Sequence, residues 1–445
     1  MPKTAQGDRV ARNSSVAYRP VRLLAVTTAF CGLSSLVHGA GFSLIEQSGS
    51  GIGSAFAGSA ASYDDASAMY FNPASLSLLG STQVALAGHG INLAAEFDDG
   101  GSSLPPAGLG RLPTGRTSDN AGDLIGVPNA YFSLRFTQRF AFGLGVNVPF
   151  GLETKYNDPW IGRFQGINSE LKTVNVNPAL SWKVNNWLAI GGGGNYQYAE
   201  AKLSNAVILG PATEGRALVD VDDKAYGWNA GAIVTLPTKA RIGLSYRSKV
   251  NFKLQGDTTI TGPTGQPIPA VSGSTTVPIT FPDSAFLSFA QPLSEQFELR
   301  GDVSWMNWSE VGTIGAFNTN TGVLRDVLVF QFEDAMRVAL GTVWNKSEQW
   351  TFRSGIAWDE SPVSDQFRTV RLPDADRYWL SFGAAWRPFK PVSIDVGYAH
   401  LFVKDANINL TRQQLGSTTF ANSTVIGNYE NAVDIVSLQL TYAFN

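Results

Sequence analysis

Two histidines are the first residues in the sequence whose type could support catalysis. They are His89 and His400, the only histidines beyond the N-terminal leader described below. Lipid hydrolases and acyltransferases generally need a histidine that activates a serine, and no serine motif stands near either histidine. We therefore expect no enzymatic activity and keep a lipid-modifying enzyme only as a distant alternative.

Neither the acidic nor the glycine-rich run of the chain matches a binding motif. Asp220–Asp223 lacks the glycine turn and the distal glutamate of a calcium loop. The glycines of residues 49–58 superficially resemble a dinucleotide-binding loop, but no strand precedes them and no βαβ unit follows. Cys31 is the only cysteine, which leaves the exported chain without a thiolate site or a disulfide. We expect no metal and no cofactor.

The first 39 residues have the features of a secretory signal peptide. Five basic residues precede an apolar run from Leu23 to Val37, and this run is too short for a spanning helix. The exported chain is expected to begin at Ala40-Gly41-Phe42. A lipoprotein anchored at Cys31 is disfavoured because Phe30 stands where a small residue is needed.

Charge and composition exclude two further classes. The chain has a formal net charge of −3, and loss of the basic leader makes it more negative, which argues against nucleic-acid binding. No other stretch offers the roughly 18 apolar residues of a membrane helix. The remaining chain is rich in Gly, Trp, Phe and Tyr, a composition typical of a β-barrel with aromatic girdles.

Alternation of apolar and polar residues dominates from about residue 82 to the end. In the last segment, the apolar side chains are Val436, Leu438, Leu440, Tyr442 and Phe444. Segments 140–152, 241–255 and 297–305 repeat the pattern, the last with Glu298, Arg300 and Asp302 on its polar side. Because charges facing lipid are costly, this polar side is expected to face a lumen.

Long and short breaks between these segments alternate along the chain. The seven long breaks are 97–126, 153–170, 204–217, 256–276, 312–327, 359–376 and 404–430. The six short breaks are 137–139, 184–186, 237–239, 292–295, 345–348 and 387–391. A soluble β-sandwich or propeller also alternates, but long external loops and short periplasmic turns favour a membrane barrel. We therefore predict an all-β fold, a 14-stranded antiparallel transmembrane β-barrel over residues 81–445.

Residues 40–80 differ from the rest because glycine, alanine and serine break any strand pattern. A segment of this kind has too little apolar mass for a core of its own. We expect it to lie inside the barrel as a hatch that plugs the lumen. On composition alone, a flexible N-terminal tail stays open as the alternative.

Motifs along the exported chain resemble those of the FadL family of outer-membrane transporters. In the N-terminal segment they are Ala40-Gly41-Phe42, the run from Gly51 to Gly58, Asp64-Asp65-Ala66 and Asn72-Pro73-Ala74. In the later segments they are Pro149 to Thr154, Arg353 to Ala357, Asp359 to Pro362 and Pro373 to Ser381. The resemblance implies a hatched fourteen-stranded barrel in the outer membrane of a Gram-negative bacterium. It also implies passive uptake of long-chain fatty acids or, in some relatives, of aromatic hydrocarbons of the toluene or xylene type.

Pro149-Phe150-Gly151 is the candidate for the release of the cargo. Proline cannot donate a ladder hydrogen bond, so Pro149 predicts either a bulge or break in the strand, or simply the start of an external loop. The resemblance favours the break, because strand three of these transporters kinks inward and leaves a lateral gap in the wall. Asn72-Pro73-Ala74 is expected beside that gap as a gate, and Ala40-Gly41-Phe42 beside the substrate pocket.

The substrate is less well defined than the route. The fatty-acid importers hold the carboxylate with basic residues at two places that Asn205 and Gly315 occupy here. Lys202, Arg216 and Arg337 lie on or near the expected lumen and are possible replacements, although ordinary lumen ion pairs explain each of them. An uncharged hydrocarbon would need none.

The remaining expectations concern rivals and partners. A general diffusion porin or an adhesin is disfavoured by the extra residues that a hatch would place in the lumen. We expect outer-membrane lipid, lipopolysaccharide and the barrel-assembly machinery as partners, no nucleic acid, and a monomer. Assembly signals usually end on an aromatic residue, whereas Asn445 follows Phe444 here.

Overall fold

The computed structural model describes residues 40–105, 112–210, 212–413 and 422–444. All of these residues belong to one compact unit, Ser34–Asn445. The expected signal peptide, residues 1–39, lies outside the described residues, as does Asn445. Among the described residues, no helix combines the length and the apolar character needed to cross a membrane.

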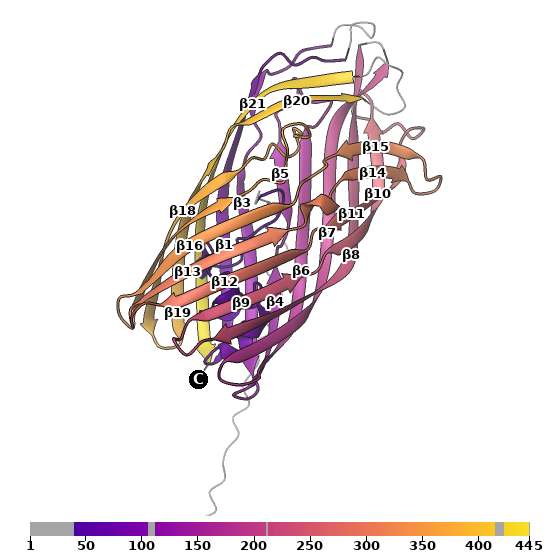
Figure 1. Cartoon of the computed structure of the whole chain (residues 1–445). Coiled ribbons are helices and arrows are strands. Elements are labelled where there is room, and N and C mark those ends of the chain that lie inside the picture. The colour runs from indigo at the N-terminus through magenta and orange to yellow at the C-terminus, as the bar shows by residue number, and fades with distance from the viewer. Residues whose placement is uncertain (1–39, 106–111, 211, 414–421, 445) are drawn as a thin grey trace, which may run out of the picture. The chain divides into compact units, whose positions relative to one another are not determined.

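The sheet is a closed antiparallel barrel of fourteen strands, which confirms the predicted fold (Figure 1). Seven strands are continuous: β1 (Thr82–Asp99), β6 (Asn168–Lys183), β7 (Leu188–Gly210), β8 (Thr213–Thr235), β17 (Trp350–Asp359), β18 (Arg377–Phe389) and β21 (Asn422–Phe444). β1 pairs with β21 along its whole length, from Thr82 opposite Phe444 to Asp99 opposite Gly427. This pairing closes the barrel and leaves no long free edge.

The other seven strands consist of two consecutive segments each. They are β2 (Ser118–Asn120) with β3 (Leu124–Arg135), β4 (Phe140–Asn147) with β5 (Gly151–Lys155), β9 (Arg241–Arg247) with β10 (Val250–Thr261), β11 (Gly273–Phe281) with β12 (Ser284–Pro292), β13 (Phe297–Met306) with β14 (Thr313–Asn318), β15 (Leu324–Val329) with β16 (Ala335–Asn345), and β19 (Val392–Val403) with β20 (Ala406–Gln413). A short helix, η5 (Trp308–Glu310), stands between β13 and β14.

Burial along the strands follows the alternation of the sequence. In β21, Val436 and Leu438 are 57% and 58% exposed, whereas Ser437 and Gln439, which alternate with them, are fully buried. Outward-facing aromatic rings stack near the short turns, such as Phe140 on Trp182. Apolar side chains therefore face the lipid and polar side chains the lumen, as outer-membrane barrels require.

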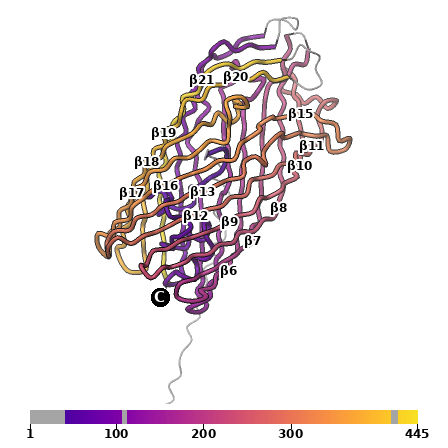
Figure 2. Tube along the Cα trace, in the orientation of Figure 1, coloured from indigo at the N-terminus to yellow at the C-terminus, as the bar shows by residue number. Residues whose placement is uncertain are grey.

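Four of the expected long loops are much shorter than their sequences suggested. Residues 204–217, 256–276, 312–327 and 404–430 contain the paired ends of β7 and β8, β10 and β11, β14 and β15, and β20 and β21. Figure 2 shows these strands running on at the end of the barrel opposite the C-terminus. Their polar composition suggested loops. Strands that extend beyond the lipid-facing apolar belt of the barrel remain paired, however, because they need no apolar face there.

The N-terminal segment, residues 40–81, lies inside the barrel (Figure 1). It contains four short helices: α1 (Gly49–Ile52), η1 (Ser59–Ala61), η2 (Ala66–Met69) and η3 (Pro73–Leu78). α1 contacts β18, β19 and β21, η1 contacts β9 and β12, and η3 contacts β6, β7 and β8. The segment therefore touches widely separated parts of the wall.

Glycines in the wall leave the room that this segment needs. A Cβ atom at Gly355 of β17 would lie 2.3 Å from the backbone carbonyl carbon of Ser54. One at Gly243 of β9 would lie 2.0 Å from the carbonyl oxygen of Ala60. No side chain fits at these distances, so the segment and the wall are matched backbone to backbone.

A side chain at Gly355 should therefore displace the N-terminal segment without unfolding the barrel. We expect Gly355→Val to keep the heat-modifiable mobility of a folded barrel, because valine favours strands, but to raise ion conductance in planar bilayers. Gly88→Val is the matched control, since a Cβ atom at Gly88 has no neighbour within 4 Å. A folded Gly355→Val barrel with the conductance of the parent chain would contradict this close fit.

Candidate functional site

The barrel wall is interrupted where Pro149 was expected to break strand three of the barrel, which consists of β4 and β5 in this structure. β4 ends at Asn147 and β5 begins at Gly151, so Val148–Phe150 stand outside both segments. β3 pairs with β4 only from Ala130 onward, although β3 itself starts at Leu124. We call this stretch, between residues 124–129 of β3 and residues 148–154, the wall interruption.

The start of the N-terminal segment covers the wall interruption from inside. Ser43 forms an isolated antiparallel bridge with Phe150. On either side of this bridge, Leu44 N donates to Pro149 O at 2.9 Å and Gly151 N donates to Phe42 O at 2.8 Å. The segment thus supplies the backbone partners that a regular neighbouring strand would have supplied.

Two side chains extend this cover. The Gln47 amide donates to Val148 O at 3.0 Å, and the Asn129 amide of β3 donates to Glu46 O at 2.9 Å. The segment is therefore bonded to both sides of the wall interruption.

Phe42 anchors the cover in a cluster of aromatic rings. Its ring centroid lies 4.6 Å from that of Trp308, 5.6 Å from that of Phe281 and 5.9 Å from that of Phe150. The backbone N–H of Gly41 donates to Asp374 Oδ2 at 2.8 Å. Ala40, Gly41 and Phe42 thus lie beside the wall interruption, with Gly41 and Phe42 buried and Ala40 partly exposed.

A cavity adjoins this cluster. Its apolar lining includes Leu44, Phe71, Phe286, Met306, Trp308 and Ala335. Its charged lining consists of Arg247, Arg337 and Asp359. An apolar cavity with a few charged groups is the form expected of a site for a small amphiphilic or hydrophobic ligand.

Of the three cations considered from the sequence, the structure places only Arg337 on this cavity. Lys202 pairs with Glu200 at 2.5 Å and lies opposite Asp220. It lies an even number of residues from Tyr196, which is exposed on the outer face, so both side chains point to that face of β7. Arg216 is exposed and shares the parity of Tyr226 and Trp228. The expectation that Lys202 and Arg216 lie on or near the lumen was therefore wrong.

Asn72-Pro73-Ala74 does not lie beside the wall interruption, contrary to expectation. Cβ atoms at Gly191 of β7 and Gly231 of β8 would meet Ala74 N and Asn72 Oδ1 at 2.5 Å and 2.3 Å. Ala74 O accepts from Ser181 near the C-terminal end of β6, whereas Phe150 contacts the β6 residue Thr173. Eight residues of strand correspond to roughly 26 Å.

Asn72 instead holds the N-terminal segment to the wall. Its side chain accepts from Ala74 N at 3.0 Å and so caps η3. Its amide donates to Ala60 O at 2.8 Å and to Ala232 O of β8 at 3.0 Å. The motif is therefore an anchor in this structure.

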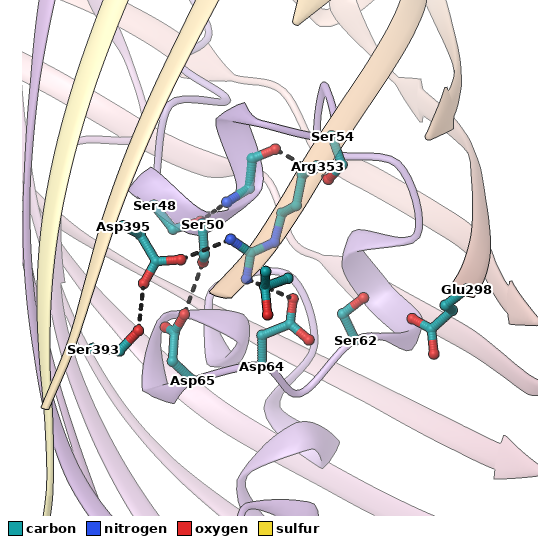
Figure 3. Close-up of polar contacts among 12 residues, drawn as sticks. Ser48, Ser50, Ser54, Ser62, Asp64, Asp65, Glu298, Arg353, Ser393 and Asp395 are labelled. Carbon is teal, nitrogen blue, oxygen red and sulfur yellow. Dashed lines mark hydrogen bonds and ion pairs between the residues drawn. The ribbon is translucent and has the colours of Figure 1, made fainter. Parts of the chain in front are cut away.

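A network of charges holds the middle of the N-terminal segment. Asp64 pairs with Arg300 at 2.7 Å. Arg353 pairs with Asp395 at 2.7 Å and lies 3.9 Å from Asp64 (Figure 3). Burial alone would raise the pKa of Asp64, but Arg300 holds it well below its usual range. Arg300 also pairs with Glu298 at 2.7 Å, so the inward charges of β13 do form a lumen network.

Comparisons with known proteins agree with this architecture. The family described as "Outer membrane protein transport protein (OMPP1/FadL/TodX)" matches residues 31–444. This chain belongs to that family of outer-membrane proteins. The long-chain fatty acid transport protein of Escherichia coli K12 is 30% identical over 429 residues, covering 86% of this chain and 93% of that protein. Outer membrane protein P1 of Haemophilus influenzae is 29% identical, covering 94% and 98%.

Solved structures show the same fold at lower sequence identity. A FadL homologue of Pseudomonas aeruginosa superposes with a TM-score of 0.83 at 22% identity, covering 91% of this chain and 100% of that chain. The toluene transporter TodX of Pseudomonas putida superposes with a TM-score of 0.67 at 16% identity, covering 86% and 94%. The recognition of the FadL family from its motifs is thereby confirmed.

Neither histidine of this FadL-family chain that the structure describes is among the residues that line the cavity. His89 Nδ1 is 2.6 Å from Ser437 Oγ, and no described carboxylate bonds to the other ring nitrogen. His400 pairs with Asp434 at 2.8 Å and is partly exposed. Neither therefore forms a histidine and serine arrangement oriented by a carboxylate.

Two buried charges escaped the sequence analysis. Arg371 donates to Asn205 Oδ1 at 3.2 Å, so a cation reaches the place where the family's basic residue is missing. Burial lowers the pKa of Arg371 to about 9. Glu46 is fully buried and neither of its carboxylate oxygens bonds to a described group. The sequence alone gave no signal for Arg371. Only the comparison with the family, in which a basic residue stands at the position of Asn205, could have directed attention to the residues that contact Asn205.

Burial raises the pKa of Glu46 to about 7, with Arg337, Arg377 and Asp359 as its charged neighbours. The folded protein therefore holds a proton that the unfolded chain releases between about pH 4.5 and 7. The stability that this group contributes is fully present below that window and is lost as the pH rises through it.

Glu46→Gln should therefore stabilise the protein at pH 8 and have little effect at pH 5. We expect a gain at pH 8 of about 3 kcal/mol in the free energy of unfolding. Guanidinium unfolding in detergent micelles, followed by tryptophan fluorescence, measures it. Glu295→Gln in an exposed turn is the matched control. An equal gain at both pH values would mean that the ionisation of Glu46 is not the cause.

Proposed function

We propose that this chain carries hydrophobic compounds, above all long-chain fatty acids, passively across the outer membrane. The observation that carries the proposal is the wall interruption, covered from inside by Phe42–Gln47 and adjoining an apolar cavity. The curated relatives named as long-chain fatty acid transport proteins support this substrate class.

The cargo enters through the external loops, occupies the cavity and leaves sideways into the lipid through the wall interruption. Each CH₂ group kept out of water contributes about 0.8 kcal/mol. Lateral release keeps the whole hydrocarbon chain out of water, whereas release into the periplasm does not. Displacement of Phe42–Gln47 opens the route, and a concentration gradient drives the transfer.

The N-terminal segment acts as a hatch in this proposal. Its contacts with widely separated strands and its backbone fit to wall glycines support a plugged lumen that conducts ions poorly. The same architecture distinguishes the chain from a general diffusion porin. Insertion by the barrel-assembly machinery, contact with lipopolysaccharide and a monomeric state belong to the same proposal.

Uptake of aromatic hydrocarbons is the second candidate. Asn205 and Gly315 offer no charge to a carboxylate, and the solved relatives of the same fold include toluene transporters. Labelled oleate and labelled toluene, offered to a transporter-deleted Gram-negative strain that expresses this chain, separate the two candidates.

Replacing Pro149-Phe150-Gly151 with Val-Thr-Val should close the wall and abolish uptake. A regular strand sequence supplies the missing donor at position 149 and lets β4 and β5 join. We expect oleate uptake to fall to the level of the deletion strain while the barrel keeps its heat-modifiable mobility. Unchanged uptake by a folded variant would contradict lateral release through the wall interruption.

A reversible disulfide tests whether the cover must move. Ser43 and Phe150 face each other in an antiparallel bridge flanked by hydrogen bonds, a pairing with Cα atoms about 4.5 Å apart that is within disulfide reach. We expect Ser43→Cys with Phe150→Cys to block oleate uptake when oxidised and to restore it when reduced. Ser43→Cys alone is the control, and uptake through the oxidised pair would rule out displacement of the cover.

A further inference from the structure

We propose that Arg337 binds the carboxylate of an amphiphilic ligand whose hydrocarbon chain fills the cavity beside Phe42. This inference rests on the proposed function and deepens it, because it assigns the charged end of the ligand to one residue. It also separates fatty acids from uncharged hydrocarbons as cargo.

Arg337 is a buried cation that forms no ion pair within 4 Å among the described residues, although Glu46, Asp302 and Asp359 lie near enough to interact with its charge. Its side chain is 5% exposed, and Nη2 donates to Ala55 O at 2.7 Å. Nε and Nη1 are buried without any hydrogen-bond partner among the described residues. Burial of a guanidinium is unfavourable unless the group is paired and its donors are satisfied. The site is therefore incomplete without an anion.

The carboxylate closest in the sheet does not complete the site. Asp359 stands directly opposite Arg337 in the pairing of β16 with β17. The two charges interact, but no ion pair within 4 Å joins the two side chains among the described residues, and Nε and Nη1 of Arg337 keep no hydrogen-bond partner. The guanidinium carbon of Arg337 instead lies 5.2 Å from the centre of the Trp379 ring. The head group thus rests on an aromatic face, with donors left for a ligand.

The remaining charge of the cavity also favours an anion. Arg247, the second guanidinium of the lining, donates to the neutral acceptors Asn195 Oδ1 at 2.5 Å and Tyr70 O at 2.8 Å. Two arginines and one aspartate line the cavity, so the lining itself offers more cationic than anionic groups to a ligand.

The other buried cation near the family's missing basic positions is a poorer candidate. Arg371 does not line the cavity. It bonds to four neutral oxygens: Asn168 O, Ser169 Oγ, Ser204 O and Asn205 Oδ1. Arg371 therefore ties a loop to the wall, while Arg337 faces empty space.

The test compares an acid with its own ester. We expect cis-parinaric acid to bind the purified chain in detergent about ten- to hundredfold more weakly after Arg337→Gln, which is the range for loss of a charged hydrogen bond. Methyl parinarate should bind both proteins equally, and Arg337→Lys should restore part of the affinity for the acid. Lys202→Gln, on the outer face, is the matched control and should change neither affinity.

Each other outcome counts against a defined statement. Equal weakening of acid and ester by Arg337→Gln would assign Arg337 to packing and overturn the inference. Unchanged binding of the acid would place the carboxylate elsewhere and overturn it as well. Binding of the ester but not of the acid by the parent chain would overturn it and leave uptake of neutral hydrocarbons standing. Binding of neither would overturn the proposed function itself.

Discussion

Within a bilayer every backbone N–H and C=O group needs a partner from the protein, because lipid offers none. The paired strands of the closed sheet meet this requirement, but they separate at the wall interruption, where β3 pairs with β4 only from Ala130 onward. There Leu44 N, Phe42 O and the Gln47 amide satisfy the groups that a regular strand would have satisfied. The cover is therefore part of the barrel's hydrogen bonding, and proline at position 149 removes one donor that would otherwise be orphaned.

The same requirement explains why only the start of the N-terminal segment is suited to move. Phe42–Gln47 is held to strand three by a few hydrogen bonds, each worth about 1 kcal/mol net. The rest of the segment is held by Asn72, by the ion pairs of Asp64 and Arg353, and by backbone fit to wall glycines. In our proposal, opening of the wall interruption therefore leaves the rest of the N-terminal segment in place.

Much of this architecture could be predicted from the sequence, because lipid on one side and polar lumen on the other force a period of two on every strand. Fourteen strands, the alternation in β21 and the break at Pro149 all follow from local rules. The strand ends outside the apolar belt of the barrel could not be predicted. Residues 204–217, for example, pair as strands although no alternation of apolar residues marks them. The position of Asn72-Pro73-Ala74 also escaped, because a segment without periodicity carries no signal of which wall strand it meets.

The candidate cations show where local reasoning ends. Side chains alternate between the two faces of a strand, so counting from the aromatic residues Tyr196 and Tyr226 would have placed Lys202 and Arg216 on the outer face. The alternation alone was therefore sufficient for two of the three candidate cations. For Arg337 parity gives the lumen but not the partner, because its neighbours Ala55 and Trp379 come from distant parts of the chain. In our proposal, the donors that Arg337 leaves open beside the apolar cavity are satisfied by the carboxylate of the cargo, which no local rule of the sequence could have indicated.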